Sequence, residues 1–406
     1  MTTQARLAQA QQVLDTWIHT PPNGDPYIPH YAQAVLPYHN TPGPLYDTVC
    51  AVLEQRPEIG ASHLETLVLR ALQKQIIAID ADYPANLTTA DAWDKHIQYV
   101  ISDPIMGAEW QYDMHHRDLQ SNVPNRGDNL KVFLSLANHL GRLSSGSIIE
   151  VGCSQNMILK RLARQQQLGS AAVMRHFGAN DTTIPLPHVL NPGTPDINAA
   201  YTRAYQQLLH EPIPFTQAVG LDHVDPQTSR DWAYLSVYPG EYQDRERMQD
   251  ARELIFHTYP TVDFYQADFD EVDMQTLYRR FPNLGSSSAE VLFFCTSAYQ
   301  SPPDKRLRMF HKAAAAAAEF VIVQDNCMVD MRDPTKLAFP SDWQSVPFSY
   351  RMYVLDKRAA EPVWQELFMS PNTRVDQLRI GSATIVDCYG TSVAAWDVLH
   401  DIANGQ

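Results

Sequence analysis

The sequence predicts an α/β protein in which a helical N-terminal domain, residues 1–145, precedes an α/β domain, residues 146–406. Two patterns lead to this prediction. Apolar residues recur every three or four positions through much of the first region, which is the spacing of one helix face. From Ser147 onward, short apolar runs alternate with helical segments, which is typical of a parallel sheet covered on both faces.

Four segments of the N-terminal region carry helical spacing, at residues 5–18, 45–53, 64–79 and 130–143. Residues 21–44 are rich in proline and tyrosine, which predicts an irregular but ordered loop or arm. The neighbours His115 and His116 would point about 100° apart on a helix, so they cannot both ligate one metal ion without further ligands. No metal site is therefore expected.

Five short strands are expected in the α/β domain, at residues 148–151, 217–221, 262–267, 291–295 and 320–324. Helical segments separate the last four, at residues 244–256, 274–280 and 305–318. The long insertion between the first two strands, residues 169–214, contains one expected helix near 199–209. Residues 348–355 and 377–389 show strand-like alternation and are joined through residues 362–372, which predicts an antiparallel pair at the sheet edge.

The first expected strand and the helix after it carry the most informative motif. Residues 147–162 read SIIEVGCSQNMILKRL, a β-branched run that ends in an acid and a glycine before helical spacing begins. In an open α/β sheet, such a turn lies beside the ligand crevice. Gly152 allows a sharp bend and the close approach of a ligand, and the free N–H groups at the start of the helix can bind an anionic group.

Composition limits the classes of partner and the compartment. The 406 residues carry a formal charge of -15, which argues against a broad nucleic-acid-binding surface. The five cysteines are widely spaced, odd in number and never in a C-x-x-C pair, so neither a zinc site nor a disulfide framework is expected. The N-terminus lacks a signal-peptide pattern, and the longest apolar run, residues 313–323, is too short to cross a bilayer. A cytoplasmic protein without a membrane or nucleic-acid partner is expected, and its oligomeric state is open.

Four motifs follow one another in a recognisable order: Ile149-Glu150-Val151-Gly152-Cys153-Ser154, Asp222 at the end of the second strand, Gln266-Ala267-Asp268-Phe269, and residues 293–299 after the fourth strand. In this order the chain resembles the class I S-adenosylmethionine-dependent methyltransferases. It looks more closely like an uncharacterised bacterial family, a domain of unknown function assigned to that superfamily, through residues 119–126, 149–154, 220–226 and 238–245. The resemblance implies a Rossmann-like methyltransferase sheet, with parallel strands closed by an antiparallel C-terminal hairpin.

The resemblance also implies which residues hold the cofactor, S-adenosylmethionine. Gly152, with Glu150 and Ser154, would meet its amino acid end. Asp222 would accept hydrogen bonds from the two ribose hydroxyls, which suits a carboxylate. Asp268 and the Phe269 backbone would contact the adenine amine. Aspartates at strand ends also serve as helix caps and turn residues.

Methyl transfer is largely an in-line displacement in which positioning supplies much of the acceleration, and a general base is needed only for a protonated nucleophile. Groups expected near the reacting methyl follow the fourth and fifth strands, and are Ser297, Tyr299, Asp325 and Asn326. The resembled family implies that Asn122 and Arg126 face the acceptor, a small molecule or a peptide. Loop polarity and helix capping account for these residue types equally well.

The sequence departs from the methyltransferase pattern in its first loop, where Ser154 and Asn156 stand at positions that smaller residues usually occupy. If residues 171–177 form the second strand instead of 217–221, Asp222 loses its role. The turn also differs by one residue from the G-x-S-x-G elbow of α/β-hydrolases, in which Ser154 would be the nucleophile.

The sequence leaves one further interpretation open and excludes another. A methyltransferase-like scaffold or regulator without catalytic activity is an alternative, because a fold does not guarantee a chemistry. A DNA amino-methyltransferase is rejected, because Ser301-Pro302-Pro303 is followed by Asp304 where an aromatic residue is expected, and it lies late after Cys295.

Overall fold

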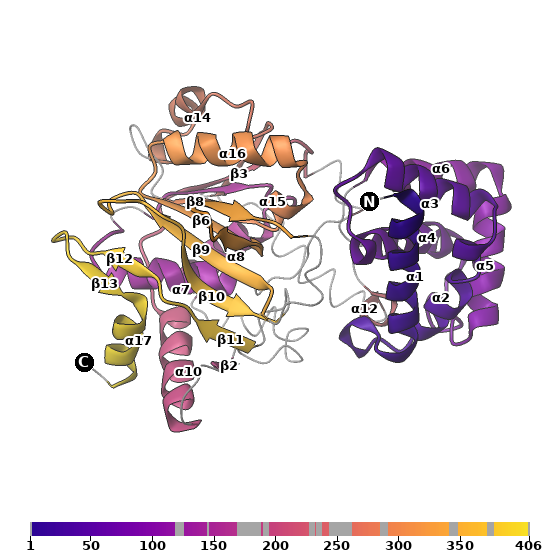
Figure 1. Ribbon diagram of the computed structural model, residues 1–406, viewed down its shortest axis with the longest axis horizontal. Coiled ribbons are helices and arrows are strands. Elements are labelled where there is room, and N and C mark those ends of the chain that lie inside the picture. Colours follow the sequence, from indigo (N-terminus) through magenta and orange to yellow (C-terminus); the bar gives the residue numbers. More distant parts are fainter. Residues whose placement is uncertain are drawn as a thin grey trace. The chain divides into compact units, whose positions relative to one another are not determined.

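A computed structural model describes residues 2–117, 126–143, 146–168, 188–189, 195–226, 232, 238–242, 262–284, 291–340, 348–371 and 377–404. The chain forms two compact units (Figure 1). A helical unit comprises Met1–Asn122 and Ser229–Asp250, and an α/β unit comprises Val123–Thr228 and Ala251–Gln406. The helical unit is therefore discontinuous in sequence, unlike the uninterrupted domain at residues 1–145 that the sequence predicts.

The helical unit packs its helices around large aromatic side chains. Its elements are α1 (Thr3–His19), η1 (Pro22–Gly24), α2 (Ile28–Val35), η2 (Tyr38–Asn40), α3 (Pro44–Gln55), α4 (Ala61–Ile79), α5 (Ala90–Ser102), α6 (Pro104–His116) and α12 (Pro239–Tyr242). The buried ring of Trp93 meets Tyr31 and Tyr83 edge-on, with ring centroids 5.3 and 6.2 Å apart. Residues 21–44, expected to be irregular, contain α2, whose Pro29 lies in the first turn, where proline is tolerated.

A short segment from the middle of the chain completes this helical unit. Gly240 N donates to Asp25 at 2.7 Å, and the Tyr242 ring lies 5.3 Å from Tyr83. The guanidinium of Arg70 lies 4.8 Å from the centre of the Tyr238 ring. These contacts explain why residues that lie in sequence between β3 (Ala218–Asp222) and β4 (Val262–Gln266) of the α/β unit belong to the helical unit.

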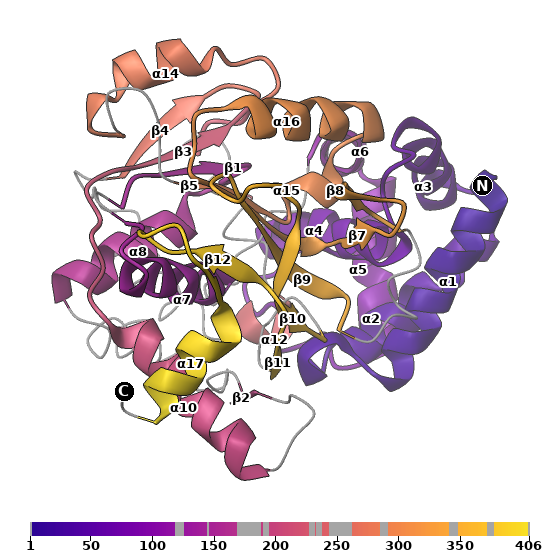
Figure 2. The ribbon, with the colours of Figure 1, turned by 60° about the vertical axis from the view of Figure 1, so that its left-hand side comes forward.

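The α/β unit is built on a nine-stranded mixed sheet, in the order β2-β11-β10-β9-β6-β5-β1-β3-β4 (Figure 2). The strands are β1 (Ile148–Val151), β2 (His188–Val189), β3 (Ala218–Asp222), β4 (Val262–Gln266), β5 (Val291–Cys295), β6 (Phe320–Asn326), β9 (Tyr350–Asp356), β10 (Gln365–Ser370) and β11 (Gln377–Ile380). Strands β4, β3, β1, β5 and β6 are parallel neighbours, and β9 joins β6 antiparallel. Two small hairpins, β7 (Met328–Asp330) with β8 (Asp333–Ala338) and β12 (Thr384–Val386) with β13 (Ser392–Ala394), complete the described strands.

The C-terminal hairpin differs from the prediction. Strand β9 pairs with β10, which lies in the segment expected to be a connection, and residues 377–389 form two strands instead of one. A register shift between Glu366 and Phe368 lets the adjacent Leu367 and Phe368 both be buried. Such a bulge interrupts the alternation of apolar and polar residues by which a strand is recognised.

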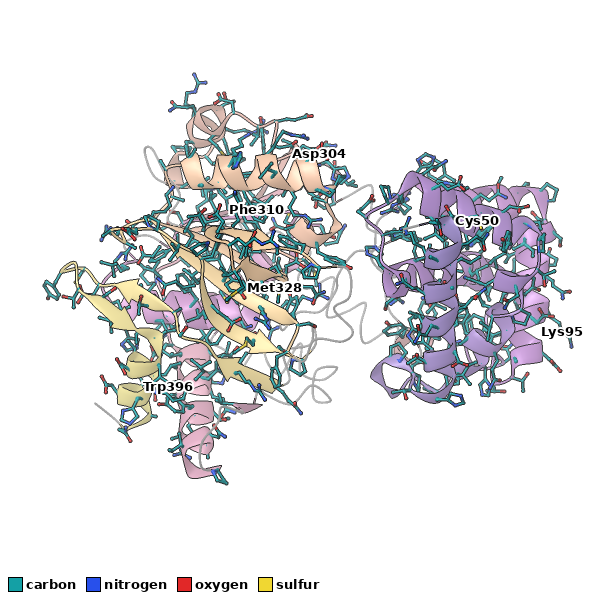
Figure 3. The ribbon with its side chains drawn as sticks, in the orientation of Figure 1. Cys50, Lys95, Asp304, Phe310, Met328 and Trp396 are labelled. Carbon is teal, nitrogen blue, oxygen red and sulfur yellow. The ribbon has the colours of Figure 1, made fainter. Side chains whose placement is uncertain are left out.

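Helices cover both faces of the sheet (Figures 1 and 2). On the first face lie α7 (Arg126–His139), α8 (Met157–Leu168), α10 (Pro195–His210) and α17 (Ala395–Ala403), and on the second lie α14 (Met274–Arg280) and α16 (Pro303–Ala315). Two further short helices are η3 (Pro282–Leu284) and α15 (Ser297–Gln300). Alternation along β1 points Ile148 to the first face and Ile149 to the second. Figure 3 shows Phe310 of α16, whose ring lies 5.7 Å from Phe294 of β5.

Helix α7 belongs to the α/β unit, although the sequence predicts it at the end of the helical domain. Its Phe133 packs edge-on against Phe320 of β6 at 5.0 Å. The buried Lys131 donates to Ser135 at 3.0 Å and to backbone carbonyls at the end of α10, and burial lowers its pKa to about 8. The first division between the two units falls after Asn122 and not after residue 145. Helical spacing shows that one face of a segment is buried, but it does not show which element covers that face.

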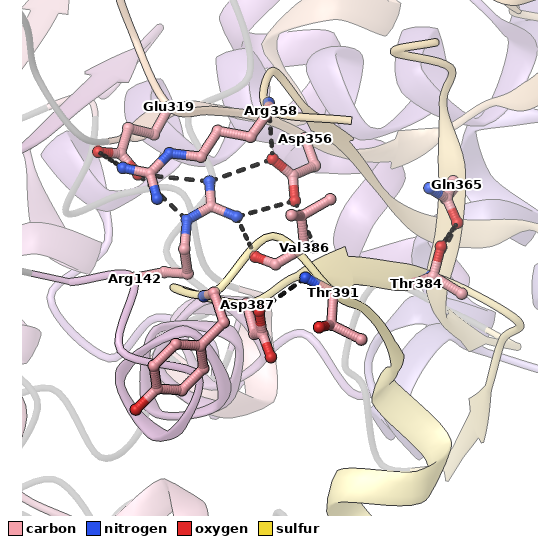
Figure 4. A network of polar contacts seen from close by, with 10 residues as sticks. Arg142, Glu319, Asp356, Arg358, Gln365, Thr384, Val386, Asp387 and Thr391 are labelled. Carbon is pink, nitrogen blue, oxygen red and sulfur yellow. Dashed lines mark hydrogen bonds and ion pairs between the residues drawn. The ribbon is translucent and has the colours of Figure 1, made fainter. Parts of the chain in front are cut away.

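A buried ion network holds the amino-terminal edge of the sheet (Figure 4). Arg142, just after α7, binds both carboxylate oxygens of Asp356 at 3.0 and 3.1 Å and donates to Val386 O. The same guanidinium reaches Glu319 at 3.3 Å and stacks over Phe320. Because a bidentate arginine–carboxylate pair is strong and directional, this network ties α7 to β9 and to the hairpin formed by β12 and β13.

Candidate functional site

The strand order reverses at β1, which defines the place where an open α/β sheet binds its ligand. Apart from the two-residue β2 at the far edge, the chain adds β3 on one side of β1 and later β5 on the other. Ligands of such sheets bind outside the carboxyl ends of the strands at this switch point. The turns that follow β1, β3 and β5 therefore form the candidate site.

Backbone strain concentrates in two of these turns. Ser154 and Asn156, after β1, have φ of 50° and 60°, and Thr296, after β5, has φ of 53°. In the described part of the chain, only one other residue that is not glycine, Phe348, has a positive φ. Asparagine tolerates this conformation, but serine and threonine are strained in it, and such strain is typical of functional sites. The first loop thus takes left-handed conformations without extra glycines.

The role of Gly152 differs from the one expected. Its φ is 71°, and a Cβ atom added there would overlap the side chain of Ser297. The space that glycine provides is therefore used by the turn after β5 and not left open for a ligand. Gly220 on β3 plays a matching part, because its Cβ would lie 2.5 Å from the Sγ of Cys153.

Asp222 lies at the carboxyl end of β3 and ties this strand to the first loop. Its carboxylate accepts hydrogen bonds from Ser154 N at 2.8 Å and Val224 N at 3.2 Å, and pairs with His223 Nδ1 at 3.1 Å. Burial alone would raise the pKa of Asp222, but these donors outweigh it and lower the pKa below its usual value. The carboxylate is therefore ionised and oriented.

The position of β3 beside β1 settles which segment is the second parallel strand. Residues 218–221 pair with β1 over its whole length, so Asp222, the next residue, keeps its place at the switch point. The competing segment, residues 171–177, lies outside the described residues.

Glu150 lies on the first face of β1, beneath α8. One carboxyl oxygen accepts the N–H of Leu159, in the first turn of α8, whereas Oε2 has no hydrogen-bond partner among the described residues. Burial, and then the charge of Asp222, raise the pKa of Glu150 to about 8. At neutral pH this side chain is mostly a neutral carboxylic acid.

Asp268 and Phe269, expected to contact the adenine, already have contacts within the protein. The Asp268 carboxylate forms an ion pair with Lys305 of α16. The Phe269 ring is buried against Phe294, with centroids 5.4 Å apart, so its side chain is part of the core. A ligand at this turn would have to share Asp268 with Lys305.

The candidate catalytic residues gather around Asp325 at the end of β6. Its two carboxylate oxygens accept hydrogen bonds from Tyr299 N and Asn326 N, both at 2.8 Å. Burial raises the pKa of Asp325 to about 6, and burial together with Asp325 raises the pKa of Tyr299. The buried hydroxyl of Ser297 has no hydrogen-bond partner among the described residues. The structure thus brings Ser297, Tyr299, Asp325 and Asn326 together at the carboxyl ends of β5 and β6. Within this group, the Asp325 carboxylate accepts the backbone N–H of Tyr299 in the short helix α15.

Arg126 begins α7 and reaches the same edge of the sheet. Its Nη1 donates to Thr296 Oγ1 at 3.1 Å, and its carbonyl accepts from Gln324 Nε2 at 3.0 Å. Gln324 also donates to the hydroxyl of Tyr350 at 3.2 Å. The other expected acceptor-binding residue, Asn122, lies outside the described residues.

Sequence reasoning missed Thr296, Gln324 and Tyr350. The one available sign was Gln324, a polar residue that ends the apolar run of residues 320–323 and is fully buried. A buried amide needs partners, so it marks a polar network.

The hydrolase alternative lacks its central contact in the described part of the chain. A serine nucleophile needs a base within hydrogen-bond reach. The hydroxyl of Ser154 has no hydrogen-bond partner there, and the nearby His223 pairs with Asp222.

Comparisons with known proteins add no assignment. No protein-family model matches the chain, and no curated protein matches it significantly. Within the described ranges, no group of three or more His, Cys, Asp or Glu side chains is arranged to hold a metal ion. None of the helices described there is long and apolar enough to cross a membrane.

Proposed function

We propose that this protein is an S-adenosylmethionine-dependent methyltransferase that acts on a small molecule or a peptide. The observation that carries the proposal is Asp222, an ionised carboxylate at the switch point that the strained first loop holds in place. The resemblance of motifs described above supports it, together with the parallel strand order around β1.

The residues at this edge fit the cofactor in part. Two backbone N–H groups orient the carboxylate oxygens of Asp222. The half-exposed imidazole of His223 also pairs with this carboxylate, and the hydroxyls of a bound ribose would displace the imidazole or bind beside it. Three buried oxygens near the first loop have no hydrogen-bond partner among the described residues: Glu150 Oε2, Ser154 Oγ and Ser297 Oγ. A bound ligand could supply their hydrogen bonds. When bound, S-adenosylmethionine would supply a methyl group on a positively charged sulfur.

The protein's own groups would orient the acceptor and manage its proton. Asp325, with its pKa raised to about 6, can accept a proton near neutral pH. Arg126 would position an acceptor beside the turn after β5, because its guanidinium already reaches Thr296. Positioning of this kind supplies much of the acceleration in a displacement reaction.

A scaffold or regulatory protein with the same fold is the second candidate. Two observations favour it, namely that Ser297 fills the space beside Gly152 and that Lys305 is paired with Asp268. Both would hinder a cofactor that needs these turns open.

Calorimetric titration with S-adenosylmethionine and S-adenosylhomocysteine separates the two candidates. We expect micromolar binding, about -8 kcal/mol, that Asp222→Ala weakens by at least about 100-fold, since each of the two hydrogen bonds to this charged group contributes roughly 1.5–3 kcal/mol. The matched control is Asp304→Asn, which removes an exposed carboxylate on α16 and should leave binding unchanged.

No heat with either ligand and an unchanged melting temperature would contradict the methyltransferase proposal and favour the scaffold. Labelling of Ser154 by a fluorophosphonate would instead revive the hydrolase alternative.

A further inference from the structure

We propose that Glu150 distinguishes the positively charged methyl donor from its demethylated product by releasing a proton when the donor binds. This inference rests on the proposed methyltransferase function and deepens it. Methyl transfer turns a sulfonium into a thioether, so the donor and the product differ by one positive charge. A site that changes its own charge by one can recognise that difference.

The geometry of Glu150 suits such a role. Its side chain is 3% exposed, and strand alternation places it with Ile148 on the face of β1 that α8 covers, four residues before the strained Ser154. One oxygen is engaged by Leu159 N–H, and Oε2 has no partner among the described residues. A purely structural cap for α8 would not require a buried second oxygen that is left without a donor, because an unsatisfied polar atom costs about 1–3 kcal/mol.

The charged groups around Glu150 explain why it holds a proton in the free protein. Burial is the main cause, and the charge of Asp222 on β3 adds to it, so the pKa of Glu150 rises to about 8. The thiols of Cys153, in the first loop, and Cys295, on β5, are neutral neighbours whose own pKa values are raised by burial and by Glu150.

Two cations act on these thiols. Lys160 of α8 lowers the pKa of Cys153, and Arg126 of α7 lowers that of Cys295, but the burial of each thiol outweighs its cation. The imidazole of His223 faces Asp222 on its outer side. In the free protein at neutral pH, the Glu150–Asp222 pair therefore carries one negative charge.

A cation placed at this edge of the sheet changes that balance. An opposite charge nearby favours the ionised form of a carboxyl group, so the carboxylic acid of Glu150 becomes a carboxylate and one proton leaves to solvent. The pair then carries two negative charges and attracts the donor more strongly. When the ligand loses its positive sulfur, the proton returns to Glu150 and the attraction falls, which favours release of the product.

Proton release can be counted without any methyl transfer. Titration calorimetry at pH 7 in two buffers of different ionisation enthalpy should show about one proton released per S-adenosylmethionine bound, and clearly fewer for S-adenosylhomocysteine. The Kd for S-adenosylmethionine should fall by up to tenfold per pH unit between pH 6 and 8 and level off above pH 8, because binding that releases a proton is favoured as pH rises. An infrared difference spectrum should show loss of a protonated carboxyl band on binding.

Two variants identify the group that releases the proton. In Glu150→Gln, which keeps the size and the hydrogen bond to α8, proton release should vanish and the Kd values of the two ligands should agree within about threefold. In His223→Asn, which removes the other titratable group beside Asp222, proton release should persist.

The outcomes separate this inference from the proposed function. Failure of the parent protein to bind either ligand would contradict the methyltransferase proposal itself. Binding without proton release, or release that persists in Glu150→Gln, would overturn the role of Glu150 and leave the methyltransferase proposal standing. If the Glu150→Gln variant does not fold, the parent protein still tests the inference, because binding without proton release overturns it and loss of the protonated carboxyl band on binding supports it.

Discussion

Buried ionisable groups have different surroundings at the amino-terminal and carboxyl-terminal ends of the parallel strands. At the amino-terminal edge, Arg142 and Asp356 are both buried, and each oxygen of the carboxylate meets a guanidinium nitrogen. At the carboxyl-terminal edge, Glu150 is just as buried, yet one of its oxygens has no partner among the described residues. A satisfied network stabilises a fold, whereas an unsatisfied one beside strained backbone is typical of a site that awaits a ligand.

Substitution of Arg142 tests the satisfied edge and should have the largest effect on stability. Arg142→Met leaves Asp356 charged and buried without its partner, so we expect the free energy of unfolding to fall by about 3–5 kcal/mol. Urea titration measures the loss. The control is Arg358→Met, which breaks a half-exposed pair with Glu319 and should cost less than about 1 kcal/mol. Equal losses in the two variants would show that burial does not decide the contribution of these pairs.

The next largest expected effect is the contribution of Glu150 to the pH dependence of the free energy of unfolding. Its pKa is raised in the folded protein, so between the unfolded value and about 8 the native state holds a proton that the unfolded chain has lost. Stability therefore falls as pH rises through this window, by up to about 1.4 kcal/mol per unit. We expect the parent to lose about 2–3 kcal/mol relative to Glu150→Gln between pH 5 and pH 7.

Urea titrations of the ligand-free protein at both pH values check this pH effect. The exposed Glu271→Gln variant is the control and should follow the parent. A difference between Glu150→Gln and the parent that does not change with pH would mean that Glu150 is ionised in the folded protein.

Close packing between the turns after β1 and β5 predicts a smaller effect. Gly152→Ala both overlaps Ser297 and places a Cβ at positive φ, so it should destabilise the fold by about 1–3 kcal/mol. Adding Ser297→Gly should recover part of this loss, with a coupling energy of about 0.5 kcal/mol or more in a double-mutant cycle. Strict additivity of the two changes would show that the turns do not press against each other.

Relief of strain in the first loop should give the smallest effect. Ser154→Gly removes a left-handed serine and a buried hydroxyl without a described partner, so stability should rise by at most about 1 kcal/mol. Thermal unfolding of this variant beside the parent measures the change. A clear destabilisation would reveal a contact of the Ser154 side chain that supports the loop.

Local patterns in the sequence determined the five parallel strands, the turn after β1 and the position of Asp222 at the end of a strand. These features depend on residues close together in the chain, since the alternation of a strand, the spacing of a helix and the acid or glycine between them occupy a few consecutive positions. The α/β class of the fold follows from the same patterns and is confirmed.

Only the tertiary structure decided what each segment touches. Helix α7 packs on the sheet of the α/β unit, β10 forms across a bulge, Ser297 takes the space beside Gly152, and Lys305 pairs with Asp268. The proton on Glu150 belongs to the same group, because burial under α8 and the charge of Asp222 on another strand raise its pKa. Periodicity tells which face of a segment is buried, but packing partners and pKa values arise from residues far apart in the chain.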